Sequence, residues 1–317
     1  MDAQRRRALL GADRAPAVPV SDNWVAIVNP ACGGRSLAGP RLSKLVRRLA
    51  EVADPVVTTE YQGHAQRLAA DFRSADGFIV AGGDGTIFDV LQTLRRDHQQ
   101  ALIVPIGRGN SLARDLGGLS PESALSAAAS GEKITIDLLA VSLEFDDGQP
   151  WQGVSASTLA LGYPADVAHL ATRYLRWTGR HCYTLAAPVI RPSAMTMRVS
   201  YDGEPSASRT GTGLIINNTR HIGPFEGFPE ANLADGLCDV MELRAGWCVQ
   251  NMHNLSVLTR WHGFVPASIR RAQTVTVALD EPTVIKIDGE LRPGVRRVEV
   301  RVLPAALTCR VPGGAHD

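Results

Sequence analysis

The sequence predicts a three-layer α/β domain with a parallel sheet, followed by an antiparallel β-sandwich domain. Its 317 residues are enough for about two domains. Up to about residue 133, short apolar runs alternate with helical patterns, as in parallel sheets that carry helices on both faces. From residue 134 onward, short β-rich runs separated by turn residues predominate, which is typical of an antiparallel sandwich.

The elements of the first half alternate regularly along the chain. Apolar runs bounded by turn residues predict buried strands at residues 24–29, 56–59, 77–81 and 101–105. Apolar residues at helical spacing predict helices at residues 37–52, 64–74, 87–97 and 112–116. We therefore expect the α/β domain to span residues 22–133, after a mobile tail at residues 1–21.

The second half is rich in β-branched residues. Its β-rich runs lie at residues 134–145, 151–161, 194–203, 212–218, 237–244, 274–279, 283–290 and 296–303. Two helical segments interrupt these runs, around residues 165–189 and 247–262. We expect the sandwich to span residues 134–304 and leave open whether residues 305–317 return to the first domain.

Composition excludes several classes of protein. Thirty-three basic and 32 acidic residues give a formal charge of +1, so no basic field exists to attract nucleic acid. The five cysteines are odd in number and none forms a CxxC pair, which disfavours a zinc site and favours a cytoplasmic location. No apolar run approaches the ~18 residues that span a bilayer. The first 21 residues lack the apolar core of a signal peptide, and contact of Arg5–Arg7 with anionic lipid is the alternative to a solvated tail.

Three glycine-rich loops follow predicted strands of the first half. They are Asn29–Gly34, Gly82–Thr86 and Gly107–Ser111. In an open α/β sheet, ligands bind beyond the carboxyl ends of the strands, where glycine lets the backbone approach a phosphate closely. Asp84 lies in the second loop and offers the hard oxygen ligands that suit Mg²⁺ or its water shell.

Tight turns with helix caps are the alternative for any one of these loops. Their repetition at three strand ends favours a phosphate site instead. The chain contains no GxxxxGK[ST] motif, which excludes a P-loop enzyme. It also lacks the HRD and DFG motifs of protein kinases.

The GGDGT motif at residues 82–86 is specific, and it lies between NPACGG at 29–34 and PIGRGNSLAR at 105–114. With these motifs the chain resembles the diacylglycerol kinase catalytic-domain family, which includes bacterial lipid kinases of diacylglycerol kinase type and the sphingosine and ceramide kinases. The resemblance extends from about Val25 to about Val302. Further matches are Asp137 in ITIDLLAV, LGYPADVA at 161–168, PEANLADGLCDV at 229–240 and IDGE at 287–290.

The resemblance implies an ATP-binding α/β domain, a lipid-binding sandwich and an active site in the cleft between them. It implies transfer of the ATP γ-phosphate to a lipid alcohol, either diacylglycerol or a sphingoid base or ceramide. The residues that it implies in ATP binding are Asn29, Pro30, Ala31, Cys32, Gly33, Thr59, Gly82, Gly83, Asp84, Gly85, Thr86, Gly107, Arg108 and Asn110.

The resemblance also implies catalytic roles for four acidic residues. Mg²⁺ is expected near Asp84 through water, with help from Asp137 and the IDGE carboxylates. Glu290 is expected to be the general base, with Asp288 as the neighbour that shares the task. A hairpin turn is the alternative at Asp288–Gly289, because Asp-Gly is a strong turn former.

A second, structural Mg²⁺ site is implied at the other Asp-Gly pair of the sandwich. The expected ligands are the Asp235 carboxylate and the backbone carbonyls of Asn232 and Leu237. A plain Asp-Gly turn is again the alternative, and the sequence leaves both open.

The chain departs from the family pattern at several positions. Cys32 replaces a usual serine, Asp89 a frequent glutamate, and Arg108 a common threonine or serine. Ser111 stands where bacterial diacylglycerol kinases usually have aspartate, so the loop is closer to that of the sphingosine kinases. This favours a sphingoid base or ceramide without settling the substrate.

A lipid substrate implies a peripheral membrane surface at the inner face of the membrane. Residues 172–183 and 259–271 mix arginines with aromatic residues, as interfacial segments do. We favour the alternative for both, an amphipathic helix with its aromatic residues in the core. NAD kinase, which shares GGDGT, and a catalytically weak lipid- or nucleotide-binding regulator are the alternative functions. A homodimer is left open.

Overall fold

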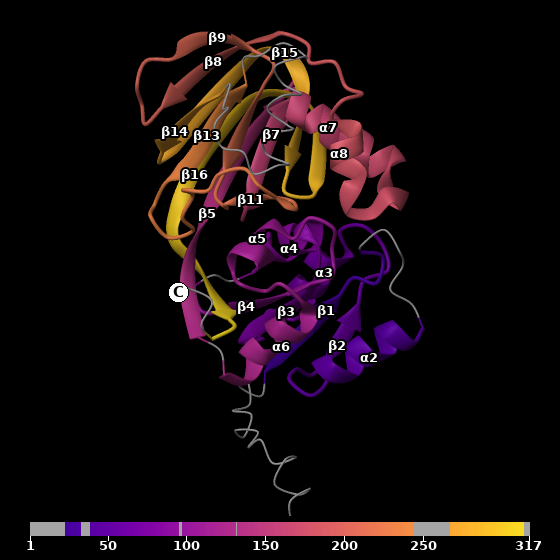
Figure 1. Ribbon diagram of the computed structural model, residues 1–317. Coiled ribbons are helices and arrows are strands. Elements are labelled where there is room, and N and C mark those ends of the chain that lie inside the picture. Colours follow the sequence, from indigo (N-terminus) through magenta and orange to yellow (C-terminus); the bar gives the residue numbers. More distant parts are fainter. Residues whose placement is uncertain (1–22, 33–38, 95–96, 131, 244–266, 314–317) are drawn as a thin grey trace, which may run out of the picture.

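The computed structural model describes residues 23–32, 39–94, 97–130, 132–243 and 267–313 (Figure 1). The predicted fold class is confirmed: an α/β part with parallel strands is followed by an antiparallel β part. Several predictions lie outside the described residues. These are the tail at 1–21, the nucleotide contact of Gly33, the helix at 247–262, and the part of segment 259–271 before residue 267.

The parallel sheet has the strand order β2-β1-β3-β4. Its strands are β2 (Val56–Thr58), β1 (Trp24–Val28), β3 (Gly77–Gly82) and β4 (Gln100–Pro105). Strands β1 and β3 are buried along their whole length, because helices cover both faces of the sheet.

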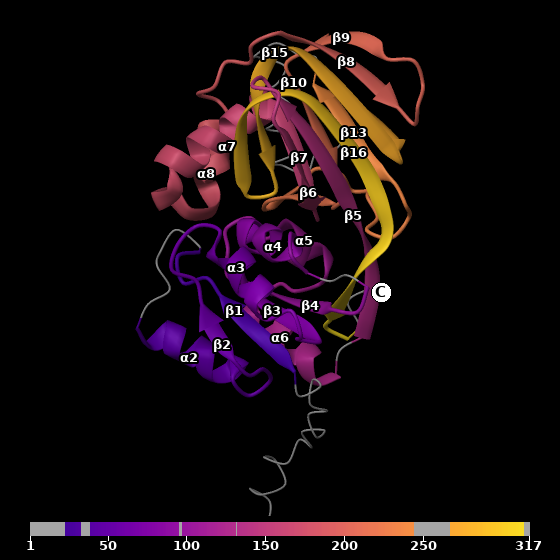
Figure 2. The ribbon, with the colours of Figure 1, turned by 180° about the vertical axis from the view of Figure 1, so that it is seen from behind.

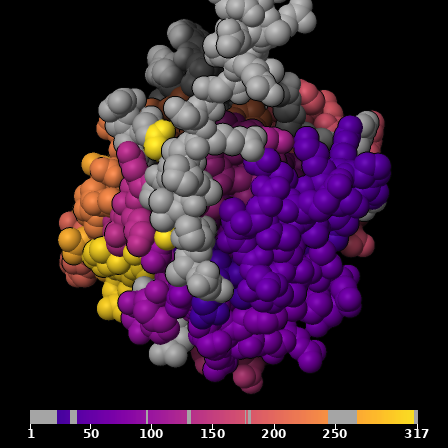
Figure 3. Space-filling view, turned by 90° about the horizontal axis from the view of Figure 1, so that it is seen from below, coloured from indigo at the N-terminus to yellow at the C-terminus, as the bar shows by residue number. Residues whose placement is uncertain are grey.

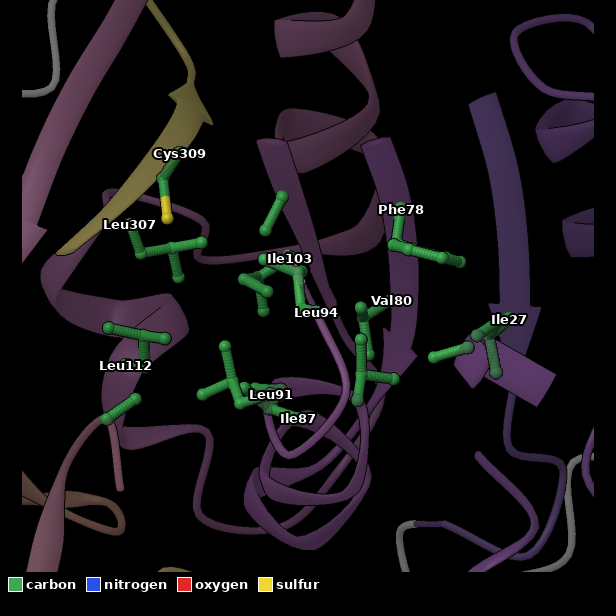
Figure 4. Packing of buried hydrophobic residues seen from close by; sticks show 14 of the residues in the cluster. Ile27, Phe78, Val80, Ile87, Leu91, Leu94, Ile103, Leu112, Leu307 and Cys309 are labelled. Atoms are coloured by element: carbon green, nitrogen blue, oxygen red, sulfur yellow. The ribbon is translucent and has the colours of Figure 1, made fainter. Parts of the chain in front are cut away.

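The helices are divided between the two faces of this sheet. The helices α3 (His64–Asp71), α4 (Asp84–Leu91) and α5 (Ser111–Asp115) pack on the face that carries Ile27, Phe78, Val80 and Ile103 (Figure 4). The opposite face packs against α2 (Pro40–Leu49) and α6 (Pro121–Ser130). Each fully buried Leu, Ile or Phe side chain contributes roughly 1.5–3 kcal/mol, so these two clusters hold the three layers together.

The antiparallel part is a sandwich with a core of its own. Its main strands are β5 (Glu132–Phe145), β6 (Pro150–Ser155), β7 (Thr158–Gly162), β8 (Met195–Tyr201), β9 (Ala207–Gly211), β10 (Gly213–Asn217), β13 (Cys238–Leu243), β14 (Ala267–Ala272), β15 (Thr274–Ile287) and β16 (Glu290–Val311). A short hairpin, β11 (His221–Ile222) and β12 (Phe225–Glu226), stands apart from this sheet. Strand β15 pairs with β8 through its first half and with β7 through its second half, so it belongs to both layers.

Two long strands connect the domains. Strands β5 and β16 run side by side from the sandwich to the α/β part (Figures 1 and 2). The end of β16 pairs in parallel with β4, with Thr308 opposite Gln100, so residues 308–310 extend the first sheet. Seen from below, yellow residues of this C-terminal region reach the surface beside magenta residues (Figure 3). A double strand connection restricts how far the two domains can rotate against each other.

Three helical segments lie beside the sandwich, above the α/β part (Figure 1). They are α7 (Tyr163–Tyr174), η1 (Arg176–His181) and α8 (Cys182–Ala186). No helix within the described ranges has both the length and the apolar character needed to cross a bilayer.

Two details differ from the sequence prediction. Helix α4 begins at Asp84, inside the GGDGT motif, because Gly83 has extended backbone and the following N–H groups turn back to its carbonyl. Helix α6 was not predicted, although Ser120-Pro121-Glu122 before an alanine-rich run is a typical helix start.

Candidate active site

The three glycine-rich loops lie at one edge of the parallel sheet. Asn29 follows β1, Thr59 follows β2, Gly83 follows β3 and Gly107 follows β4. Because parallel strands point the same way, their carboxyl ends place these residues together.

Hydrogen bonds join the first loop to the second. The Asn29 side chain donates from Nδ2 to Thr86 Oγ1 over 2.9 Å and accepts from the Ala31 N–H over 3.0 Å. Cys32 Sγ lies 3.7 Å from the same Thr86 oxygen. Burial raises the pKa of the Cys32 thiol, so it remains protonated and fills the place of a small polar residue.

Asp84 joins the second loop to the third. Its carboxylate accepts the Ser111 N–H over 2.8 Å and the Asn110 N–H over 3.1 Å. A Cβ on Gly109 would lie 2.6 Å from Asp84 Oδ2, so only glycine fits there. Burial raises the pKa of Asp84, although these N–H groups and Lys286 act in the opposite direction.

The second loop also contacts the IDGE segment. A Cβ on Gly289 would lie 2.5 Å from Gly85 Cα, a distance that no side chain tolerates. The backbone of Gly289 thus packs directly against that of Gly85. This contact brings Asp84, Asp288 and Glu290 together where the two domains meet. All three carboxylates interact electrostatically with Lys286.

The two IDGE carboxylates differ in their hydrogen bonds. Asp288 is 2% exposed and accepts five bonds of 2.7–3.1 Å. The donors are the hydroxyls of Ser155 and Ser157 and the N–H groups of Ala156, Ser157 and Thr158. Glu290 is partly exposed, and its Oε2 accepts a hydrogen bond of 2.7 Å from Gln62 Nε2.

Lys286 is a residue that the sequence analysis missed. Burial lowers the pKa of its ammonium, while Asp84, Asp288 and Glu290 act to raise it. Its neighbours Ile285 and Ile287 are buried in the sandwich core, so the alternation of strand β15 turns Lys286 to the other face. This alternation was the one sequence signal for its position.

A largely apolar cavity of about 340 Å³ lies next to these charges. Most of its polar lining comes from the domain junction, namely Asp84, Ser111, Ser157, Thr158, Lys286 and Asp288, and Thr184 adds a hydroxyl from α8. The apolar lining comes from α7, α8 and the strands beneath them, and includes Tyr163, Val167, Ala187, Ile215, Met241 and Leu243. Since the polar groups of the junction contact one another, they form one end of the cavity.

The charge of Arg108, in the third loop, acts on both the first loop and helix α8. Its charge acts on the thiols of Cys32 and Cys182 and on the Tyr183 hydroxyl. Tyr183 also lines the apolar cavity, and burial raises its pKa. Arg108 therefore stands at the boundary between the glycine loops and the cavity.

A second, polar cavity of about 690 Å³ has Glu290 in its lining. Gln62, Asp89 and Arg292 also line it. Burial, with Glu290 as a second cause, raises the pKa of Asp89 to about 6.

Asp137, which was expected to help hold Mg²⁺, binds two backbone N–H groups instead. Its carboxylate accepts the N–H groups of Gly236 and Ala305, each over 2.7 Å. It therefore fixes the 233–236 loop to the bend of β16, and neither cavity contains it in its lining.

The Asp235 region does not fit a metal ion. Asp235 Oδ1 accepts the Leu237 N–H over 3.0 Å, and Oδ2 lies 2.5 Å from Arg271 Nη2. The Asn232 side chain accepts the Ala234 N–H. The Arg271 guanidinium therefore already neutralises the carboxylate that Mg²⁺ was expected to use.

The aromatic residues of segment 172–183 correct one expectation. Tyr174 is 62% and Trp177 is 81% exposed, so neither is a core residue. Leu185 and Val189 are also exposed nearby. The helices that line the apolar cavity therefore carry apolar side chains on their outer surface.

Comparison with known proteins gives consistent results. Residues 23–141 match the model of the diacylglycerol kinase catalytic domain, and residues 157–311 match that of the YegS C-terminal NAD kinase beta sandwich-like domain. The chain is 29% identical to a diacylglycerol kinase of Mycobacterium tuberculosis over 244 residues, 75% of this chain and 74% of that protein. It is 27% identical to a diacylglycerol kinase of Bacillus subtilis over 280 residues, 83% of this chain and 88% of that protein.

A solved structure extends the likeness to the fold. The crystal structure of a diacylglycerol kinase from Bacillus anthracis superposes with a TM-score of 0.72 at 19% identity. The match covers 92% of this chain and 97% of that one, so both domains and their connection are shared.

Proposed function

The chain belongs to the diacylglycerol kinase catalytic-domain family, and we propose that it transfers the γ-phosphate of ATP to the hydroxyl of a membrane lipid alcohol. One observation carries this proposal: the glycine-rich loops, which are suited to bind phosphate, lie next to the polar end of the apolar cavity. Asp84 belongs to both, because it lies in the second loop and also lines the cavity.

ATP would bind at the carboxyl ends of the parallel strands. Asn29, Thr86 and the backbone of Gly82–Gly85 offer a closely packed surface for phosphate oxygens. Gly107, Arg108 and Asn110 lie on the opposite side, where the Arg108 guanidinium supplies positive charge. Thr59 is buried directly after β2, and its N–H donates to the Val28 carbonyl at the end of β1.

Mg²⁺ fits beside Asp84 as a hydrated ion. The two Asp84 oxygens each accept a single N–H bond, which leaves further lone pairs for water molecules of the ion. When bound with ATP, Mg²⁺ would neutralise charge on the phosphates.

Glu290 is the better candidate for the general base. Its Oε1 lies 3.6 Å from where a Cβ of Gly85 would stand, so it faces the GGDGT loop. Asp288 instead uses its oxygens to accept five bonds. In the reaction the acceptor oxygen bonds to the γ-phosphorus, the bond from that phosphorus to the bridging oxygen breaks, ADP leaves, and Glu290 takes the hydroxyl proton.

The lipid tail would enter the apolar cavity, with its hydroxyl at the polar end. Tyr174, Trp177, Leu185 and Val189 would contact the membrane, next to Arg173. Binding to anionic vesicles, measured by co-sedimentation, should weaken in Trp177→Ser. Unchanged co-sedimentation would remove this surface from the proposal.

An acceptor panel tests the activity. Purified protein is incubated with γ-labelled ATP, Mg²⁺ and mixed micelles that contain diacylglycerol, monoacylglycerol or ceramide, with NAD as a separate acceptor. We expect a labelled lipid that is absent with Glu290→Gln. Labelled NADP would indicate a NAD kinase, and ATP binding without any labelled product would indicate a regulator.

A further inference from the structure

The short hairpin β11–β12 forms one wall of the apolar cavity. The segment 221–227 contributes four lining residues, Ile222, Gly223, Phe225 and Gly227. Among the described strands, the hairpin pairs with none of the large sheet. Since a two-stranded hairpin alone has little stability in water, contacts with other elements must hold this wall in place.

The third glycine-rich loop and helix α5 provide such contacts. Strand β11 lies next to α5 (Figure 1). Ser111 Oγ accepts the Gly223 N–H over 2.8 Å, and one turn later Asp115 Oδ1 bonds His221 Nδ1. Residues four apart lie on one face of a helix, so α5 presents both side chains to the hairpin. The tip also packs on the loop, because a Cβ on Gly109 would lie 3.2 Å from Gly223 Cα.

Ser111 contacts both the loop and the hairpin. Its N–H donates to Asp84 Oδ1 over 2.8 Å, and its hydroxyl accepts the Gly223 N–H. Ser111 is only 4% exposed, so little solvent reaches its hydroxyl. The backbone of Ser111 thus belongs to the loops that are proposed to bind ATP and Mg²⁺, whereas its side chain holds a wall of the cavity that is proposed to bind the lipid.

We propose that Ser111 is a positioning residue for the acceptor lipid: its hydroxyl holds the hairpin against the third loop, and the hairpin packs against the lipid tail. This rests on the proposed function. Ser111→Ala separates the two contacts, because alanine keeps the N–H that bonds Asp84 and lacks only the hydroxyl. The partly buried Gly223 N–H then loses its acceptor, which is unfavourable unless the hairpin moves. A hairpin that moves no longer presents Ile222 and Phe225 to the tail in the same way.

Hydrogen exchange tests the contact without any substrate. Deuterium uptake of the amides of residues 220–228 is followed by mass spectrometry in wild type, Ser111→Ala and Ser120→Ala. Ser120 is the matched control. Its hydroxyl also accepts a backbone N–H, from Ser123 over 3.1 Å, but it precedes α6 on the other face of the parallel sheet. We expect exchange at least about fivefold faster in Ser111→Ala and unchanged in Ser120→Ala. Equal exchange in wild type and Ser111→Ala overturns the proposal.

Steady-state kinetics tests the consequence for the lipid. The assay contains γ-labelled ATP, Mg²⁺ and diacylglycerol in mixed micelles, with monoacylglycerol and ceramide run in parallel. Phe225→Ala is a second variant, which removes a lining side chain from the hairpin itself. We expect the KM for the lipid to rise at least about fivefold in Ser111→Ala and in Phe225→Ala. The kcat and the Kd of ATP should stay within about twofold of wild type, because the contact with the lipid is not specific to the transition state.

The outcomes separate this proposal from the proposed function. An unchanged KM for the lipid in either Ser111→Ala or Phe225→Ala overturns the positioning role and leaves the lipid kinase standing. A rise of the same size in Ser120→Ala overturns it too, since any lost serine hydrogen bond would then have the same effect. A weaker Kd of ATP in Ser111→Ala overturns it because the hydroxyl would then act on the nucleotide. Absence of any labelled lipid with wild type overturns both proposals.

Discussion

The Asp288–Gly289 turn and the Asp235–Gly236 turn have the same two residues in different surroundings. Asp288 is buried between the domains and accepts bonds from five donors of the 155–158 segment. Asp235 lies on the outside of the sandwich, where its partners are the Leu237 N–H and the Arg271 guanidinium.

The comparison shows how neighbours decide the role of a dipeptide. Gly289 contacts Gly85 backbone to backbone, so its turn carries Glu290 to the GGDGT loop. A Cβ on Gly236 would meet nothing within 4 Å, and its positive φ of 75° is the reason for glycine there. One turn assembles a site between two domains, and the other shapes a surface loop.

The largest effect is expected from Glu290→Gln, which tests whether the Asp288–Gly289 turn carries the general base. The amide keeps the size of the side chain and cannot take a proton, so kcat should fall by about 10²–10⁴-fold. Because the Glu290 side chain is partly exposed, the melting temperature should stay within about 2 °C of wild type. A kcat within threefold of wild type would exclude Glu290 as the base.

Asp288→Asn should reduce stability as well as activity. The amide nitrogen would face N–H and O–H donors, leaving buried groups unpaired at about 1–3 kcal/mol each. We expect urea unfolding to show a loss of about 3 kcal/mol. Full stability in this variant would mean that the five bonds do not hold the turn.

Arg271→Met tests the surface turn and should have a smaller effect. The guanidinium and the carboxylate are both partly exposed, so the loss should be about 0.5–1 kcal/mol. Since Arg271 already neutralises Asp235, chelation of Mg²⁺ should leave the melting temperature of the wild type unchanged. A melting temperature that falls on chelation and recovers with Mg²⁺ would restore the metal site.

Asp89 should make stability depend weakly on pH. Its pKa is about 6 in the folded protein and near 3.9 when unfolded, so the folded state binds more protons between these values. This contribution therefore raises stability as the pH falls from 7 toward 4. Asp89→Asn should flatten that slope in urea unfolding, and an identical slope in the variant would contradict the shift.

The strands, glycine loops and domain order of this fold were predictable because they depend on local patterns. The ends of β1, β3 and β4 follow from apolar runs stopped by Gly and Pro. The roles of Asp137, Arg271 and Lys286 depend on which distant strands become neighbours. Arg271 reaches Asp235 only because β14 pairs with β13. Lys286 interacts with Asp84 only because the turn that follows β15 packs Gly289 against Gly85 of the GGDGT loop. No spacing in the sequence contains those pairings.

We propose that ATP at the glycine-rich loops reacts with a lipid held in the apolar cavity. Filling the cavity with a larger side chain tests this most directly. Thr184 lines the cavity from α8 and is only partly buried, so Thr184→Trp should block the tail without unfolding the protein. The measurement is the Kd of ATP together with kcat/KM for diacylglycerol in this variant. We predict a Kd within twofold of wild type and a kcat/KM at least about tenfold lower. An unchanged kcat/KM would show that the lipid binds elsewhere.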